Sequence, residues 1–108
     1  FIYNMAESEK VQFAKYEVGG KYEWHQDIPD ASAKTYRKLS TMVQLSDPSS
    51  YDGGEFQFYN GENQPEDLDR KAQGSVIIFD SRDWHRLTPI TKGVRYSLAQ
   101  WSHGDRFV

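Results

Sequence analysis

The feature that most constrains the fold is a succession of short runs rich in β-branched and aromatic residues, separated by turn-forming residues. Such runs are typical of strands, because these side chains pack well on a pleated surface. Helical periodicity is weak along the whole chain, which favours a β-sandwich or a barrel-like jelly roll. We expect strands at residues 11–16, 22–27, 39–45, 55–59, 75–79 and 94–101.

The segments between these runs differ in character. Residues 17–20 (EVGG) predict a tight connection between the first two strands, and residues 28–38 predict a surface loop. The polar segment 60–73 contains a proline and is interpreted as a loop with at most one helical turn. Residues 75–79 (SVIIF) form a continuous apolar run bounded by Gly74 and Asp80, which predicts a buried strand.

Composition excludes several classes of protein. A chain of 108 residues has room for one modest core, so we expect a single domain over residues 1–108. Cysteine is absent, which excludes disulfides, cysteine-based zinc sites and a thiol nucleophile. The formal net charge of −3 argues against a nucleic-acid partner. No apolar run reaches membrane-spanning length, so we expect no membrane partner. The location is not fixed by the sequence; we expect the cytoplasm, and a monomer.

Three ligand-type residues suggest a metal site. His25 and Asp27 stand at positions i and i+2 of an expected strand, where side chains share one face, and His85 follows far along the chain. Two imidazoles and one carboxylate can hold a divalent metal on one side and leave its other positions open. The alternative is an ordinary surface pair of His25 and Asp27, with His85 packed in a loop.

A basic residue ten positions after His85 extends this pattern. Arg95 and Ser97 share one face of the last expected strand, so an inward Arg95 brings Ser97 with it. A guanidinium fork and a hydroxyl could together hold one carboxylate. The alternative is an exposed Arg95 paired with a surface acid.

The surrounding motifs resemble a known family. They comprise Gly20 and Tyr22 before the first ligands, Gly53-Gly54-Glu55 between them, Phe79-Asp80 after an apolar run, and the string WHRLTPITKGVRYS over residues 84–97. From Tyr16 to Trp101 the chain is similar to the prolyl-4-hydroxylase-like branch of the Fe(II)/2-oxoglutarate-dependent dioxygenases, and especially to PKHD-type hydroxylases.

This resemblance implies a fold and a set of roles. The fold would be an all-β double-stranded β-helix (a cupin-like jelly roll) with little helix, and its mouth would hold Fe(II) on His25, Asp27 and His85. Arg95 would bind the distal carboxylate of 2-oxoglutarate. The reaction would need dioxygen, hydroxylate a substrate C–H bond and release succinate and carbon dioxide; ascorbate as a stimulant is left open. No catalytic residue beyond the metal ligands is implied.

Three further residues are candidates for the pocket or its surroundings. Tyr16 resembles a family tyrosine that lines the cosubstrate pocket, and Trp101 matches a tryptophan near the active site of related prolyl hydroxylases. Gln44 shares a strand face with Met42 and is expected to face the interior. For Tyr16 and Trp101 a plain core role stays open. His103 lies outside the motifs and is expected to be solvent-exposed.

The resemblance also bears on the substrate and on the extent of the chain. It implies a prolyl residue of a peptide or protein, with a small molecule as the alternative, and segments 28–38 and 60–73 are where we expect a lid or specificity loop. Family members normally carry helices before the first core strand, and this chain begins at Phe1, so we expect an excised or processed core.

Two other classes of protein use a similar framework. One is a cupin-like hydrolase or isomerase with Zn²⁺ or Mn²⁺ on the same ligands, although such an enzyme needs no carboxylate clamp. The other is a catalytically silent jelly-roll binding module, which has no chemical reason to keep three ligands and Arg95 together.

Overall fold

The computed structural model describes residues 5–28, 36–59, 65–67 and 71–104. The strands are β1 (Met5–Ser8), β2 (Gln12–Tyr16), β3 (Tyr22–His25), β4 (Tyr36–Gln44), β5 (Tyr51–Gly53), β6 (Phe56–Tyr59), β7 (Pro65–Asp67), β8 (Val76–Asp80), β9 (His85–Leu87), β10 (Ile90–Gly93) and β11 (Arg95–Gly104), and the 3-10 helix η1 spans Pro48–Ser50. The prediction of an all-β fold is confirmed. Within these ranges, no helix has the length and apolar character needed to cross a membrane.

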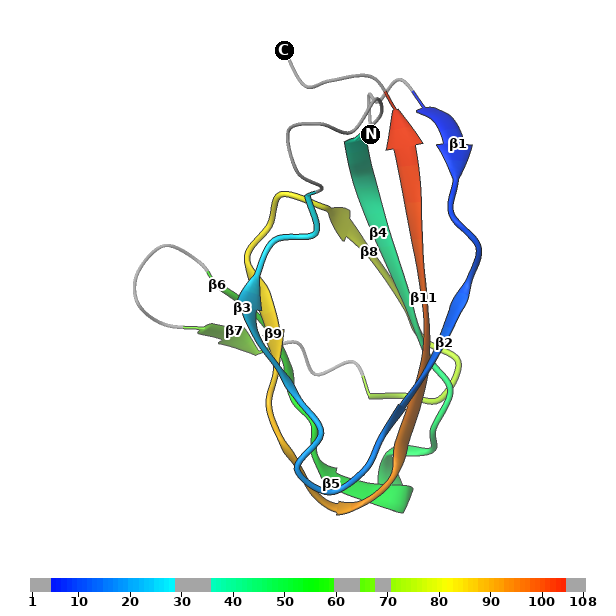
Figure 1. Ribbon diagram of the computed structural model, residues 1–108. Helices are drawn as coiled ribbons and strands as arrows, with labels where there is room; N and C mark the ends of the chain where they lie inside the picture. The colour runs from blue at the N-terminus through cyan, green and yellow to red at the C-terminus, as the bar shows by residue number, and fades with distance from the viewer. Residues whose placement is uncertain (1–4, 29–35, 60–64, 68–70, 105–108) are drawn as a thin grey trace.

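The larger sheet is built around the long strand β11. Its order is β1-β11-β4-β8, and β2 pairs with β11 on the edge that β1 also uses. β11 is antiparallel to β4 from Ser97 opposite Gln44 to Gly104 opposite Tyr36. Figure 1 shows β11 running nearly the whole length of the molecule between β4 and β2. This sheet therefore supplies one wall of the molecule.

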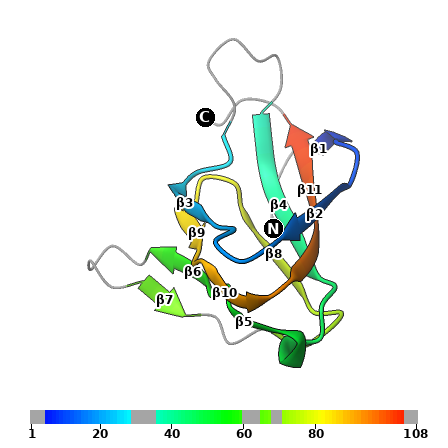
Figure 2. The same ribbon diagram turned by 60° about the horizontal axis from the view of Figure 1, so that its bottom comes forward.

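The smaller sheet supplies the opposite wall. Its order is β3-β9-β6-β7, and β5 pairs with β10 in a two-stranded ladder. Figures 1 and 2 show the two sheets on opposite sides of the molecule, with the β5 and β10 ladder at one end. Antiparallel strands that face each other in this way enclose a space between two walls, which is the arrangement of a jelly roll.

The apolar core lies between the sheets and is largely aromatic. Phe56 of β6 is 5.7 Å from Phe79 of β8 and 5.1 Å from Phe58, measured between ring centroids. Such edge-to-face and tilted arrangements add to the free energy gained from burying the rings. The buried core residues are Met42, Phe56, Ile77, Phe79 and Leu87, with Tyr16, Tyr22 and Phe58 packed against them.

One connection between the expected strands differs from a simple meander. The tight connection at residues 17–20 is present, since the Gly20 amide donates to the Glu17 carbonyl at 2.7 Å. It nevertheless joins two sheets, because β2 pairs with β11 while β3 pairs with β9. Local turn residues reverse the chain, but the pairing partner is set by tertiary contacts.

Three segment predictions need correction. Within the polar stretch 60–73, which was expected to be a loop, Pro65–Asp67 form β7 and pair with β6; residues 60–64 and 68–70 lie outside the described part of the chain. In the expected loop 28–38, residues 36–38 already belong to β4, and 29–35 are likewise not described. In both cases pairing with a neighbouring strand makes the segment a strand, although its polar sequence does not predict one.

The third correction concerns the apolar run at 75–79. β8 is buried on one face only: Ile77 and Phe79 lie in the core, whereas about half of the Val76 and Ile78 side chains is exposed. A continuous apolar run cannot by itself distinguish a strand covered on both faces from one covered on a single face.

We expect the β5 and β10 ladder to depend on a glycine. Gly93 has a φ of +76°, and a Cβ atom there would lie 2.2 Å from the Ser50 carbonyl oxygen. Gly93→Ala should therefore lower the free energy of unfolding by roughly 2–5 kcal/mol, from left-handed strain plus overpacking. Gly74 is the matched control, because its φ of +84° is similar but open space surrounds it. Gly74→Ala should cost only about 1–2 kcal/mol; equal losses in urea unfolding would contradict the steric explanation.

Candidate metal centre

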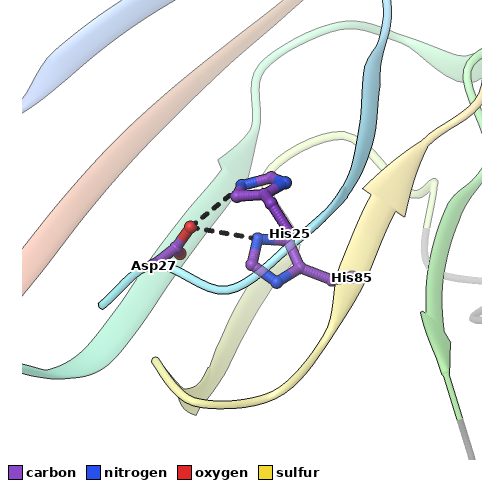
Figure 3. Close-up of side chains that lie close together, drawn as sticks. All are labelled: His25, Asp27 and His85. Carbon is purple, nitrogen blue, oxygen red and sulfur yellow. Dashed lines mark ion pairs between the residues drawn. The ribbon is translucent and has the colours of Figure 1, made fainter. Parts of the chain in front are cut away.

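The three predicted ligand residues meet at one end of the space between the sheets. His25 is the last residue of β3 and lies opposite His85, the first residue of β9, while Asp27 follows two residues after β3 ends. One ligand atom from each residue can be chosen so that all three lie within 4.8 Å of one another. Figure 3 shows both imidazole rings turned toward the Asp27 carboxylate.

The position of Asp27 differs from the sequence prediction in one respect. Asp27 is not a strand residue, so the alternation of side chains along a strand does not place it beside His25. Instead the Asp27 amide donates to the Ser81 carbonyl at 2.8 Å, which holds this residue against the chain that follows β8. The side chain is only 7% exposed. The predicted meeting of the residues is observed, but its local cause is a backbone hydrogen bond beyond the strand.

The two carboxylate oxygens of Asp27 have different surroundings. Oδ1 faces the histidines, at 3.0 Å from His25 Nε2 and 3.3 Å from His85 Nε2. Oδ2 accepts hydrogen bonds from Ser40 Oγ at 2.7 Å and from Trp101 Nε1 at 3.0 Å. The three atoms that converge are therefore two Nε2 atoms and one oxygen, Oδ1.

Hydrogen bonds at the far side of each ring fix the state of the histidines. His25 Nδ1 lies 2.8 Å from the Glu23 carbonyl oxygen, and His85 Nδ1 lies 2.8 Å from the Asp83 carbonyl oxygen. A carbonyl oxygen can only accept, so each Nδ1 carries the proton. In the neutral ring each Nε2 then offers a lone pair toward Asp27, which is the orientation that metal-ligating histidines use.

The carboxyl group of Asp27 is held in its charged form. Burial by itself would raise the pKa of Asp27, but the bonds and charge of His85 and the bonds from Trp101 and Ser40 outweigh it. The pKa of Asp27 therefore lies well below its usual range. The site therefore supplies one anionic oxygen beside two imidazole nitrogens.

This donor set fits a divalent metal with open positions. Two imidazoles and one carboxylate occupy one face of an octahedron and leave three positions, as in non-haem Fe(II) oxygenases. The accessibility of the ligands agrees with an open face, since the His25 side chain is 41% exposed while His85 is buried. Zn²⁺ and Mn²⁺ would accept the same donors, so the triad alone does not select the metal.

A cavity of about 220 Å³ adjoins the three ligands. It is lined from both sheets, and Tyr16, Ser97 and Trp101 are among its walls. These three predicted pocket residues therefore do face the same space as the metal ligands. Burial raises the pKa of Tyr16 against the opposing charge of Arg95, so its phenol stays neutral and can donate a hydrogen bond.

Arg95 is the least usual group in the core. It is 2% exposed, and its Nε and Nη1 atoms have no hydrogen-bond partner among the residues that the structure describes. Its Nη2 atom contacts the sulfur of Met42 at 3.6 Å, and its Cζ atom lies 5.5 Å from the centre of the Tyr16 ring. A buried cation without an anion is costly. The guanidinium therefore fits a carboxylate ligand that completes its hydrogen bonds.

Arg95 and Ser97 both point inward, as predicted, since each is almost fully buried. Arg95 lines a second, very small cavity of about 10 Å³, whereas Ser97 lines the larger one; Met42 and Phe56 line both. Gln44 also faces the interior, but beside Arg95 rather than beside the metal ligands, and it donates to Tyr51 Oη at 2.9 Å. A joint grip of Arg95 and Ser97 on one carboxylate stays a prediction.

The sequence prediction missed residues that shape the site. Ser40 and Ser81 are buried beside Asp27, and their hydroxyl oxygens lie 2.9 Å apart. Tyr22 also lines the larger cavity, because a register shift in β3 brings it to the same side as His25. Ser40 could have been found from alternation along its strand, since it shares a face with Met42 and Gln44.

The expectation for His103 is wrong. Its side chain is only 16% exposed, and its Nε2 lies 2.6 Å from Glu9 Oε2. Glu9 in turn binds Arg37 through two hydrogen bonds of 2.7 and 3.0 Å. The hydrogen bond from Arg37 contributes most to lowering the pKa of Glu9, so this acid is charged beside the two basic residues. Contacts with a distant part of the chain, which the sequence does not reveal, cover His103.

Comparison with protein families identifies one match over most of the chain. The family model described as the 2OG-Fe(II) oxygenase superfamily matches residues 11–103. Curated relatives include a PKHD-type hydroxylase from Delftia acidovorans, 33% identical over 97 residues, and another from Pseudomonas putida, 35% identical over 94 residues. These alignments cover 85% and 81% of this chain but only 42% and 40% of the relatives. The chain thus spans about two fifths of their length.

Solved structures share the fold. A prolyl-4-hydroxylase from Pseudomonas putida matches with a TM-score of 0.77 at 24% identity, covering 95% of this chain and 55% of that protein. A prolyl hydroxylase from Trichoplax adhaerens, solved with a peptide fragment of the hypoxia inducible factor oxygen degradation domain, also has a TM-score of 0.77, at 23% identity. This second match covers 94% of this chain and 46% of the Trichoplax adhaerens protein. The predicted double-stranded β-helix is therefore confirmed as the fold.

Proposed function

This chain belongs to the 2OG-Fe(II) oxygenase superfamily, and we propose that it is the metal- and cosubstrate-binding core of a hydroxylase. The reaction would use Fe(II), 2-oxoglutarate and dioxygen, hydroxylate a C–H bond of a prolyl residue, and release succinate and carbon dioxide. One observation carries the proposal: the ligand triad lies between the same two sheets as a buried Arg95, whose Nε and Nη1 atoms have no partner in the described part of the chain. The first selects a metal with open positions, and the second selects a carboxylate.

Each residue of the site would have a defined task. His25 Nε2, His85 Nε2 and Asp27 Oδ1 would hold the iron, while their other polar atoms stay bound to the protein. When bound, the iron supplies the activation of dioxygen that is coupled to decarboxylation of the cosubstrate. No side chain needs to act as a general acid or base.

The cosubstrate would be oriented by its far end. Arg95 would form a charge-assisted fork with the distal carboxylate of 2-oxoglutarate, and Ser97 would add a hydroxyl donor. The neutral phenol of Tyr16, whose ring lies beside the Arg95 guanidinium, would donate a further hydrogen bond. Gln44, beside Arg95, would serve as packing and as a polar neighbour of this end.

The two rival classes of protein explain less. A cupin-like hydrolase or isomerase would use the triad but would give no task to Arg95, whose Nε and Nη1 atoms lack a partner among the residues described. A silent binding module would leave both the converging ligand atoms and the guanidinium without a role. Only an enzyme that combines a metal with a dicarboxylate cosubstrate gives a task to all four residues.

A peptide or protein is the substrate class that we favour. The curated relatives are named PKHD-type hydroxylases, and one structural neighbour was solved with a peptide bound. The His25 side chain is partly exposed and Trp101 lines the cavity, so a substrate could reach the metal from outside.

We propose one domain over residues 1–108, since both sheets contribute to the site. Its cytoplasmic location, its monomeric state, the lack of a nucleic-acid partner and any effect of ascorbate stay predictions.

The test begins without dioxygen. Adding Fe(II) and 2-oxoglutarate to the folded protein should produce a weak visible metal-to-ligand charge-transfer band, and admission of dioxygen should release succinate. If a well-folded sample gives no band and releases no succinate, the proposed oxygenase activity is contradicted. Substrate preference follows from incubation with proline-containing peptides and proline-free controls, read by mass spectrometry as the gain of one oxygen atom. Equal gain in the controls would exclude a prolyl substrate.

A further inference from the structure

Both donors to Asp27 Oδ2 come from the sheet opposite the histidines. Ser40 lies on β4 and Trp101 on β11, whereas His25 and His85 lie on β3 and β9. Asp27 thus connects the two walls at the place where the ligands converge. The two bonds also divide the carboxylate, because an oxygen that accepts two hydrogen bonds has no lone pair left for a metal.

We propose that Ser40 and Trp101 are positioning residues that restrict Asp27 to a single ligand oxygen, Oδ1. The proposal rests on the proposed metal centre and goes beyond it. A carboxylate that bound through both oxygens would occupy four of six octahedral positions together with the histidines. A chelating cosubstrate and dioxygen need three positions, so a second Asp27 oxygen on the metal would block the reaction. The bonds to Oδ2 keep that third position free.

The direction of the Ser40 hydrogen bond is set by the Asp27 carboxylate, and it determines the role of a neighbouring hydroxyl. The carboxylate of Asp27 can only accept, so the Ser40 hydroxyl must donate its one proton to the hydrogen bond with Oδ2. The contact of 2.9 Å between Ser40 Oγ and Ser81 Oγ then requires Ser81 to donate. Ser81 is fully buried, and its amide donates to the Lys38 carbonyl at 3.0 Å, which fixes its position. A short chain of hydroxyls thus points toward Asp27.

The indole of Trp101 is also fixed from outside the site. The Arg37 guanidinium lies 4.1 Å from the centre of the Trp101 ring, and Glu9 holds that guanidinium through its two hydrogen bonds. A cation over an aromatic face is attracted to it and restricts the tilt of the ring. The Nε1–H bond of Trp101 is thereby directed at Oδ2, and a flexible ring would hold Asp27 less firmly.

The experiment counts the positions that remain open on the metal. Mn(II) is bound to the purified chain, and the water proton relaxivity per bound Mn(II) is measured for wild type and variants, after titration has given the bound fraction. The Ser40→Ala, Trp101→Phe double variant removes both donors while keeping an aromatic ring. Its relaxivity should fall by about one third, because one of three water positions would pass to Asp27 Oδ2.

Controls separate positioning from general disturbance. Ser40→Thr keeps the hydroxyl and should retain the wild-type relaxivity. The Ser49→Ala, Trp84→Phe double variant makes matched changes at exposed residues outside the site and should also match wild type. If the site variant no longer retains Mn(II), the single variants, each of which keeps one of the bonds, provide the same comparison.

The outcomes distinguish this proposal from the proposed function. An unchanged relaxivity per bound Mn(II) in the site variants overturns the restriction of Asp27, while the metal centre stands. A wild type that takes up no Mn(II) overturns the metal centre and the positioning role with it. The relaxivity reports the hydration of the bound Mn(II) and not turnover, so the experiment does not depend on knowing the substrate.

Discussion

Replacing Asp27 by alanine is expected to abolish iron-dependent succinate formation and to lower metal affinity by at least ~100-fold, since loss of even an outer-shell partner costs ~10–100-fold. Asp27 provides the anionic donor of the set; two neutral imidazoles would remain. The pKa of Asp27 lies well below its usual range, so its charge is present at physiological pH. Titration of Fe(II) under anaerobic conditions, followed by a succinate assay, measures both effects.

The fold should survive this change. Without the carboxylate, Trp101 Nε1 loses its acceptor, while Ser40 Oγ can still bond to Ser81 Oγ. One unsatisfied donor costs about 1–3 kcal/mol, which shifts urea unfolding without preventing folding. Asp52→Ala is the matched control, because Asp52 is exposed. Wild-type metal affinity in Asp27→Ala would remove Asp27 from the ligand set.

The predictable part of this molecule is what the sequence encodes locally. Period-two alternation along 94–101 predicts that Arg95 and Ser97 face inward, and both are almost fully buried. The positions of His25, Asp27 and His85 follow from a pattern of ligand types, and their side chains do converge. Strand direction is enough to orient Arg95 and Ser97. For Asp27 the sequence predicts the ligand type, but a backbone hydrogen bond to Ser81 beyond the strand places it.

The unpredictable part depends on which strands become neighbours. Ser40 and Trp101 lie far apart in the sequence, and the register of β4 on β11 places these two residues directly opposite each other. That register is fixed by the packing of two sheets and not by the residues themselves. The same reasoning applies to β7, whose polar sequence becomes a strand only because β6 offers an edge.

Replacing Arg95 by methionine is expected to separate cosubstrate binding from stability. Loss of a buried charge-assisted pair should weaken 2-oxoglutarate binding by about 3 kcal/mol, roughly 100-fold, while metal affinity is retained. Without ligand, the same change should leave the free energy of unfolding unchanged or raise it by about 1 kcal/mol, because an unpaired buried cation is replaced by an apolar chain. Arg95→Lys should bind 2-oxoglutarate at an intermediate level, since the planar fork is lost but the charge remains.

The matched control for Arg95 lies on the neighbouring sheet. Arg86 carries the same side chain, but its guanidinium lies 4.6 Å from the centre of the Trp24 ring and its Nε bonds to Gln57. Arg86→Met should therefore leave 2-oxoglutarate affinity unchanged in titration calorimetry of the metal-loaded protein. Unchanged affinity in Arg95→Met would refute the carboxylate role of Arg95. Burying a cation that lacks an anion should cost free energy. A large loss of stability in the ligand-free Arg95→Met variant would contradict this and show that the guanidinium stabilises the fold.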